Sequence, residues 1–323
     1  MRVPMKKVVF LLVEMFALSW ATVAFGAPMN SNSHEATVLL DNMPLDPEAA
    51  SKAEETLARL IEQHPELSPE QIYRLAAKKV AYPTYQTLFN QIADNYGKQE
   101  SILRKQMMDT LTQNTIQLTD IRVGDDFSTT SANDGNHYAF AGDSSVESEA
   151  SHDLSDNKGE VYHRTDGAGT HSANGFAWTG YRFGVTGFTT RRAQIEFTNV
   201  NGAGYQRAEC AFGASARQEA WISLRVFDLT TGTLVLDETA DYNLVRCLGT
   251  EDPSGEIDYV GVTQASGLVD LVAGHEYIAY LMVRGDAYST YFGISQFDAA
   301  DGGLGDPSLG GSISWGTLDI QWQ

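Results

Sequence analysis

Residues 221–228 read WISLRVFD, and the run TLVL at 233–236 follows after the short linker LTTG. The side chains of a β-strand point alternately to its two faces. The linker has the length and composition of a hairpin turn, so the two runs are predicted to pair as antiparallel strands. The first strand then presents Ile222, Leu224 and Val226 on one face and Trp221, Arg225 and Phe227 on the other.

The same type of pattern continues through the second half of the chain. From about Thr119 onward, alternation and glycine-bounded apolar runs replace any helical period, and strands are also expected at 193–200, 258–263, 276–284, 288–297 and 312–322. The run 276–284 is apolar on both faces, which predicts a central strand. The polar residues 125–175 form either long surface loops or weakly patterned outer strands. Together these features predict a jelly-roll-like antiparallel β-sandwich over residues 119–323.

Residues 46–118 carry a helical period instead. Asp46-Pro47-Glu48 starts one predicted helix, and Ser68 with Gln71 forms a capping box that starts a second. A third apolar stripe begins at Thr84 and passes Gly97, where one bent helix and two shorter helices both fit the sequence. The predicted fold class is therefore α+β and multidomain, with a small N-terminal helical region that forms either a bundle or a layer against the β-sandwich.

The first 26 residues have the pattern of a secretory signal peptide. Basic residues precede the apolar stretch 8–23, and Ala24-Phe25-Gly26 then fits the small-x-small cleavage rule. Residues 27–45 are predicted to be a flexible leader. No later apolar run approaches the roughly 20 residues of a membrane-spanning helix. We expect a secreted or extracytoplasmic protein, in the periplasm or at the cell surface, without stable membrane insertion.

The chain is acidic, with 42 acidic and 22 basic side chains and a formal net charge of −20. Nucleic-acid binding needs clustered lysine and arginine, so a nucleic-acid partner is excluded. An acidic surface attracts cations and keeps a protein soluble. The two cysteines, Cys210 and Cys247, are predicted to form one disulfide, because an even pair in an exported chain usually does.

Two groups of residues are candidate metal ligands. His137, His152, His163 and His171 lie within 35 residues, and imidazole suits zinc or another transition metal. Their spacing matches no compact motif, so solvated loop histidines are the alternative. Asp298, Asp301 and Asp306 lie among turn glycines and make calcium the one candidate cofactor, although their spacing fits neither an EF-hand nor a calcium nonapeptide. No cofactor is certain.

No residues complete a catalytic motif. His275-Glu276 begins like a zinc-protease helix, but Ala279 stands at the second histidine position. Aromatic residues are the remaining indication of function, because rings on a sandwich surface can stack on sugar faces while polar neighbours bind the hydroxyls. The candidate ligand-binding residues are Trp178, Tyr181, Trp221 and Trp315.

These observations support three hypotheses. The first is a secreted, non-catalytic interaction protein whose β-sandwich binds a glycan or another extracellular surface ligand, with the helical region as a means of oligomerisation. The second is a secreted hydrolase of polysaccharide or peptide, which requires two carboxylates or two of the four histidines to converge in a cleft. The third is a structural subunit of a surface layer or matrix.

Overall fold

The fold was analysed in a computed structural model of the chain. The structure describes residues 47–64, 66–113, 118–142, 146–165, 170–209, 215–248, 255–260, 263–290, 294–299 and 313–323. The predicted signal peptide, the predicted leader and the predicted cap Asp46 lie outside these residues.

Three helices come first: α2 (Pro47–Gln63), α3 (Pro69–Lys79) and α4 (Pro83–Gln113). The capping box that starts α3 is confirmed, since the backbone N–H of Gln71 donates to Ser68 Oγ and the backbone N–H of Ser68 donates to Gln71 Oε1. Helix α4 continues through Gly97, which settles the choice between one helix and two in favour of one. No described helix is long and apolar enough to cross a membrane.

The largest set of paired strands, here called sheet A, lies next to the helices. Its order is β1-β6-β13-β9-β10, and β3 also pairs with β6. All its pairings are antiparallel except β1 with β6. The strands are β1 (Thr119–Arg122), β3 (Asp134–Ala141), β6 (Thr170–Thr186), β9 (Ser215–Asp228), β10 (Thr233–Leu248) and β13 (Glu276–Thr290).

Two further sheets, both antiparallel, form the opposite layer. Sheet B has the order β12-β7-β16-β2, with β2 (Phe127–Thr129), β7 (Thr190–Thr198), β12 (Gln264–Val272) and β16 (Thr317–Trp322). Sheet C has the order β11-β8-β14-β5-β15, and β4 also pairs with β5. Its strands are β4 (Val146–Asp153), β5 (Lys158–Thr165), β8 (Asn201–Glu209), β11 (Gly255–Val260), β14 (Ile294–Ala299) and β15 (Ile313–Ser314).

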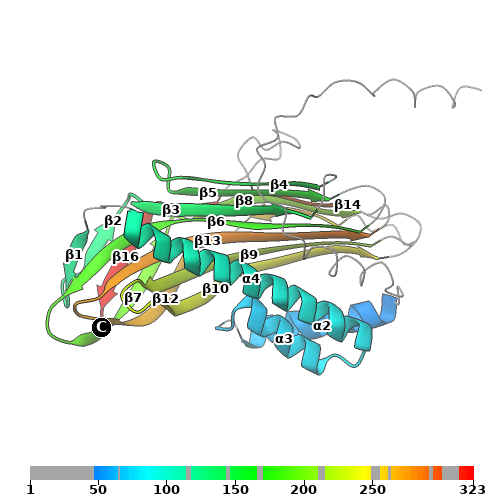
Figure 1. The fold of residues 1–323 in the computed structure, drawn as a ribbon, viewed down its shortest axis with the longest axis horizontal. Helices are drawn as coiled ribbons and strands as arrows, with labels where there is room; N and C mark the ends of the chain where they lie inside the picture. The colour runs from blue at the N-terminus through cyan, green and yellow to red at the C-terminus, as the bar shows by residue number, and fades with distance from the viewer. Residues whose placement is uncertain are drawn as a thin grey trace, which may run out of the picture.

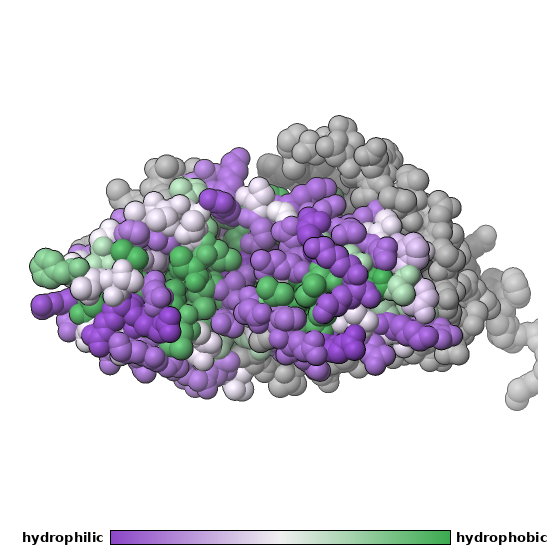
Figure 2. Space-filling model, turned by 90° about the horizontal axis from the view of Figure 1, so that it is seen from below, coloured by the Kyte–Doolittle hydropathy of each residue, from purple (hydrophilic) through white to green (hydrophobic). Residues whose placement is uncertain are grey.

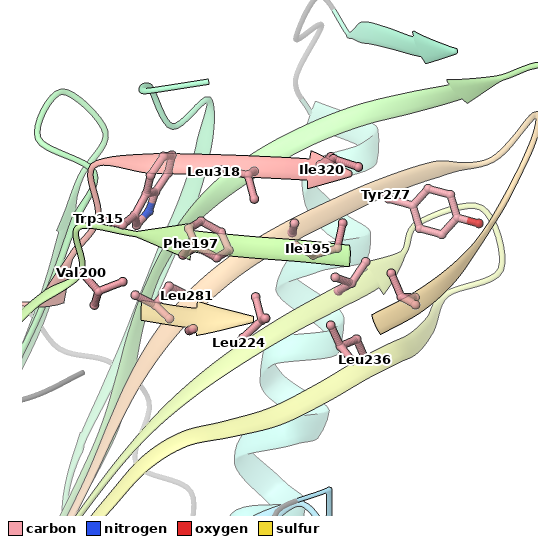
Figure 3. Packing of buried hydrophobic residues seen from close by; sticks show 14 of the residues in the cluster. Ile195, Phe197, Val200, Leu224, Leu236, Tyr277, Leu281, Trp315, Leu318 and Ile320 are labelled. Carbon is pink, nitrogen blue, oxygen red and sulfur yellow. The ribbon is translucent and has the colours of Figure 1, made fainter. Parts of the chain in front are cut away.

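The main hydrophobic core fills the space between sheet A and the opposite layer. In Figure 3, Leu224 and Leu281 of sheet A face Ile195 and Phe197 of sheet B. Sheet C adds Val161 to the same core. Burial of such apolar surface between two stacked sheets is what defines a β-sandwich. The predicted antiparallel β-sandwich after an N-terminal helical region is therefore the observed fold.

The helices cover the other face of sheet A (Figure 1), so the molecule has three layers. Helix α4 runs obliquely across the strands (Figure 1), and its Leu103 and Met107 pack against Ile278 and Met282 of β13. Helices α2 and α3 pack against sheet A through Trp221 of β9, which belongs to the same buried hydrophobic cluster as the side chains of these two helices. The open question from the sequence is answered: the helices form a layer against the sandwich.

The two faces of 221–228 are as predicted. Ile222, Leu224 and Val226 lie in the core of the sandwich, whereas Trp221 and Phe227 pack on the helix side. The run 276–284 begins β13, which lies between β6 and β9 and is therefore central, as predicted. The polar region 125–175 forms strands β2 to β5 and the start of β6 in its described parts, which confirms the alternative of weakly patterned strands.

Apolar side chains also reach the surface. On the face shown in Figure 2 they lie in separate patches with polar side chains between them. The exposed large apolar residues among those described are Met108, Phe140, Leu154, Phe188, Leu234, Val235 and Leu268. Single exposed apolar residues are normal on a folded protein. A hollow with mixed polar and apolar lining is therefore a better guide to function than these patches are.

Candidate functional site

Helix α4 crosses sheet A at a set of charged side chains that are buried between the helix and the sheet. Glu100 of α4 contacts two arginines from neighbouring strands: Arg225 Nη1 lies 2.8 Å from Glu100 Oε1, and Arg284 Nη2 lies 2.7 Å from the same oxygen. Arg225 also binds Asp237 of β10 through two hydrogen bonds of 2.7 and 2.9 Å. Both guanidinium groups are fully buried. The four residues fix the helix to three adjacent strands.

These contacts keep both Glu100 and Arg225 ionised although they are buried. Burial by itself would raise the pKa of Glu100, but the positive charges of Arg225 and Arg284 outweigh it and lower the pKa to about 2. Burial alone would lower the pKa of Arg225, but Asp237 and Glu100 raise it well above its usual value. Glu100 is therefore an ionised acceptor throughout the physiological pH range.

A pocket of 350 Å³ opens beside this ion cluster, between α4 and the ends of β9, β10 and β13. Its polar lining comes from Glu100, Ser101 and Arg104, three residues close together on the helix. Its apolar lining comes from both the helix and the sheet: Leu103, Met107, Phe227, Leu234 and Tyr280. The β9–β10 turn supplies Gly232, whose φ of +67° is the left-handed conformation that glycine adopts without strain.

A second buried polar cluster joins the helices to β9 and β13 further along these strands, away from the ends that line the pocket. The Tyr96 hydroxyl donates to Glu219 Oε2 at 3.0 Å, and Tyr73 and Arg217 both bind Glu219 Oε1. Close by, Gln99 Nε2 donates to Asp286 Oδ1 at 3.2 Å. Burial raises the pKa of Asp286 to about 7, because the hydrogen bonds and arginines around it compensate only part of the lost hydration.

The predicted aromatic ligand site is wrong for three of its four residues. Trp178, Trp221 and Trp315 are 0%, 1% and 3% exposed, so their faces cannot receive a sugar. Trp178 packs between α4 and sheet A with its ring 5.2 Å from that of Tyr280. Trp221 packs on the helices, 6.3 Å from Tyr96. Trp315 lies in the core of the sandwich, with its ring centroid 5.0 Å from that of Phe197.

Tyr181 differs from the three tryptophans because it is only half-buried. Its hydroxyl lies 2.7 Å from Thr119 Oγ1, and its ring lies 5.3 Å from that of Phe127. These contacts hold the ring beside the parallel β1–β6 pairing, away from the α4 pocket lining. A ligand-binding role for Tyr181 stays a prediction.

The four candidate histidines separate into a pair and two buried residues. His137 Nδ1 lies 2.9 Å from His152 Nδ1. His163 is fully buried, where its Nδ1 lies 2.9 Å from Ser148 Oγ, and burial lowers its pKa to about 3. His171 is also buried. In the described part of the chain, no three histidine, cysteine or acidic side chains form a group that could hold a metal ion, so the four-histidine arrangement is not observed.

The other predicted ligands lie mostly outside the described residues. Asp301, Asp306 and Cys210 are outside them, and of Asp298 and Cys247 only the backbone positions on β14 and β10 are described. The calcium site and the disulfide therefore stay predictions. His275, whose motif was incomplete in the sequence, lies in the turn between β12 and β13, where its Nδ1 is 2.8 Å from Oδ2 of Asp228 at the end of β9.

The residues of the α4 pocket were missed by the sequence analysis. A signal was available in Arg225, a charged residue inside an apolar strand on the face opposite Ile222 and Leu224. Such an arginine needs a carboxylate partner. Glu100 and Arg104 are spaced four residues apart on one side of a helix, but the sequence alone does not pair either of them with a strand 125 residues away.

No family model and no curated protein matches this sequence. Solved structures show weak similarity. The C-terminal CBM6 of LamC, a marine laminarinase from Zobellia galactanivorans, is 14% identical, with a TM-score of 0.18 over 61% of this chain and 99% of that chain. A carbohydrate-binding module (CBM6cm-2) from Cellvibrio mixtus lichenase 5A, in complex with cellotriose, is 12% identical, with a TM-score of 0.17 over 62% and 97%. Bacteriophage CBA120 tailspike protein 4 is 15% identical, with a TM-score of 0.16 over 51% and 18%.

Proposed function

We propose that this protein is a secreted, non-catalytic glycan-binding protein and that the pocket under α4 receives a sugar unit of its ligand. The observation that carries the proposal is the lining of the pocket. Glu100, Ser101 and Arg104 offer a charged acceptor, a hydroxyl and a charged donor on one side. The exposed side chain of Leu234 contributes apolar surface on the other, with the buried Phe227 and Tyr280 behind it. A sugar ring has the matching chemistry, with hydroxyls at its edge and an apolar face.

The size and rigidity of the pocket favour a small unit. Its volume of 350 Å³ is at the lower end of the range for small-molecule sites, which is roughly 300–1,000 Å³. Glu100 is held by two buried guanidinium groups and cannot swing away. A preformed acceptor costs little ordering entropy when the ligand binds.

The charge state of Glu100 favours binding over hydrolysis. Glycosidases require two carboxyl groups, one of which is protonated and acts as the acid. Among the described residues that line the pocket, Glu100 is the only carboxylate, and its pKa of about 2 leaves it without a proton to donate. The pocket thus offers a hydrogen-bond acceptor but no acid–base pair. The second hypothesis, a hydrolase, gains no support from this site.

Arg104→Ala is the variant that tests the proposal. The purified chain would first be screened on a glycan array, and the affinity for the best glycan measured by calorimetry. Removing a charged hydrogen-bond donor costs about 1.5–3 kcal/mol, so the affinity should fall by about 10- to 100-fold. Arg104 is exposed at the pocket mouth, so its loss should leave the fold intact.

Lys105→Ala is the matched control. Lys105 is the next residue of α4 and is also exposed, but it does not line the pocket, so the affinity should stay unchanged. Equal affinities of the two variants would contradict the assignment of the pocket. Release of reducing sugar from a bound glycan by the clean protein would contradict the non-catalytic role.

A further inference from the structure

A pair of histidines lies where the two layers of the sandwich meet at one edge. His137 belongs to β3, which pairs with β6 in sheet A, and His152 belongs to β4, which pairs with β5 in sheet C. Their Nδ1 atoms are 2.9 Å apart, and their ring centroids are 5.1 Å apart. The two imidazoles therefore meet nitrogen to nitrogen across the boundary between two sheets.

This contact fixes the protonation of the pair. A hydrogen bond between two Nδ1 atoms requires one ring to donate a proton and the other to accept it, so at least one Nδ1 keeps its lone pair. Replacing the shared proton with a metal ion would let both nitrogens coordinate. Tetrahedral zinc with Zn–N bonds of about 2.0–2.1 Å places two ligand nitrogens about 3.4 Å apart, which a small tilt of the two rings provides.

The surroundings leave room for the rings and support the strand that carries one of them. At Gly135, a Cβ atom would lie 2.8 Å from Cδ2 of His152, so the absence of a side chain there allows this ring to approach β3. Gln106 of α4 donates to the backbone carbonyl of His137 at 3.2 Å and holds that strand in place. The His137 side chain is exposed and His152 is half-buried, which gives an ion access from solvent.

We propose that His137 and His152 form a binding site for a divalent transition-metal ion of the zinc class, with water completing the coordination. Imidazole nitrogen suits zinc and its neighbours, and water ligands fill open positions in metal sites that are not closed by four side chains. The bound ion joins β3 of sheet A to β4 of sheet C. The site is separate from the α4 pocket lining, so it stands independently of the proposed glycan binding.

Zinc titration of the full chain tests the site. In ¹H–¹⁵N NMR of the imidazole groups, sub-stoichiometric Zn²⁺ should shift the nitrogen signals of His137 and His152 first. In calorimetry, His137→Ala and His152→Ala should each lower the zinc affinity by at least about tenfold. Loss of a residue that only hydrogen-bonds to a metal ligand already costs about tenfold or more, so loss of a ligand itself should cost no less. In the first phase of zinc binding, the double variant should have the same affinity as each single variant. A single remaining imidazole is not enough to form the site.

His64→Ala is the matched control, because His64 is also a partly exposed histidine and lies 3.3 Å from Glu66, outside this pair. It should leave the first binding phase unchanged. Unchanged zinc affinity in either pair variant, or zinc shifts that appear first at other histidines of the wild-type chain, would overturn the proposal. The NMR measurement uses the unmodified protein, so it stays decisive if a variant fails to fold.

Discussion

Glu100→Ala is expected to lower the free energy of unfolding by about 3–5 kcal/mol, the usual result of breaking a buried ion pair from one side. The alanine leaves Arg284 without the carboxylate that binds its Nη2 and takes one of the two carboxylates from Arg225. Both guanidinium groups are fully buried, so water cannot readily replace the lost oxygen atoms. The loss also removes the ionic contact between the middle of α4 and sheet A.

Urea unfolding followed by tryptophan fluorescence and by circular dichroism measures this change. Glu48→Ala is the matched control: Glu48 also pairs with a basic residue, Lys52 at 2.6 Å, but both side chains are more than half exposed. Exposed pairs contribute about 0–1 kcal/mol, so this variant should stay close to the parent. Similar losses in the two variants would contradict the assignment of Glu100 as the ionic anchor of α4.

Asp286→Asn is expected to stabilise the protein above neutral pH and to have little effect in acid. Asp286 has a pKa of about 7 in the folded protein against 3.8 for the free side chain, mainly because of burial. The folded state therefore holds a proton that the unfolded state has already lost. The stability from this group is full below pH 3.8, falls by roughly 1.4 kcal/mol per pH unit above that, and is lost once the pH has risen through about 7, a total of about 4 kcal/mol.

The measurement is the free energy of unfolding from pH 4 to pH 8 for the parent and the variant. Asparagine cannot ionise, and its Oδ1 can still accept from Gln99, so the variant should lack this part of the pH dependence. Asp270→Asn is the control, since Asp270 is 57% exposed in its pair with Arg192. Parallel pH profiles for the parent and Asp286→Asn would refute the prediction. Below pH 4.5 a separate loss of stability begins, because the unfolded chain then binds a proton at Glu100 while the folded protein, in which this pKa is about 2, keeps the carboxylate ionised.

The strands that the sequence predicted best are those whose pattern is local. Residues 221–228 alternate clearly, and 276–284 is apolar on both faces, so the faces of the first and the central place of the second follow from side-chain geometry alone. In contrast, β3 to β5 are polar, and their pattern is weak. β4 and β5 pair with each other across the short turn 154–157. The pairing of β3 with β6 and of β5 with β14 joins segments far apart in sequence, which no local signal reveals.

The error in the aromatic site has a definite physical cause. Trp178 and Trp221 lie on the face of sheet A that is turned away from the sandwich core, where an isolated sandwich would be open to solvent. The helical region covers that face. The apolar patterns predict both the helices and the strands, but a local pattern cannot show which layer covers which face. Trp315 differs from these two tryptophans because it is buried inside the sandwich core, next to Phe197, and not under the helices.

The candidate pocket could not be predicted for a related reason. Its ion cluster joins Glu100 to Arg225 and to Arg284, which are 125 and 184 residues further along the chain. Side-chain spacing within a helix reports contacts three or four residues apart. The pairing of α4 with β9 and β13 is therefore a property of the folded topology. The unusual arginine inside an apolar strand indicated that a partner exists, without indicating where it lies.

The distance in sequence between Glu100 and Arg284 also sets the order in which the protein can assemble. A ribosome that adds 5–20 residues per second needs roughly 10–40 s to make the chain between them. During that interval the apolar side of α4, with Leu103 and Met107, lacks the part of its cover that comes from β13. The full set of contacts of the helix therefore requires β13, with Ile278, Met282 and Arg284. A factor that shields nascent chains would find its target in this helix.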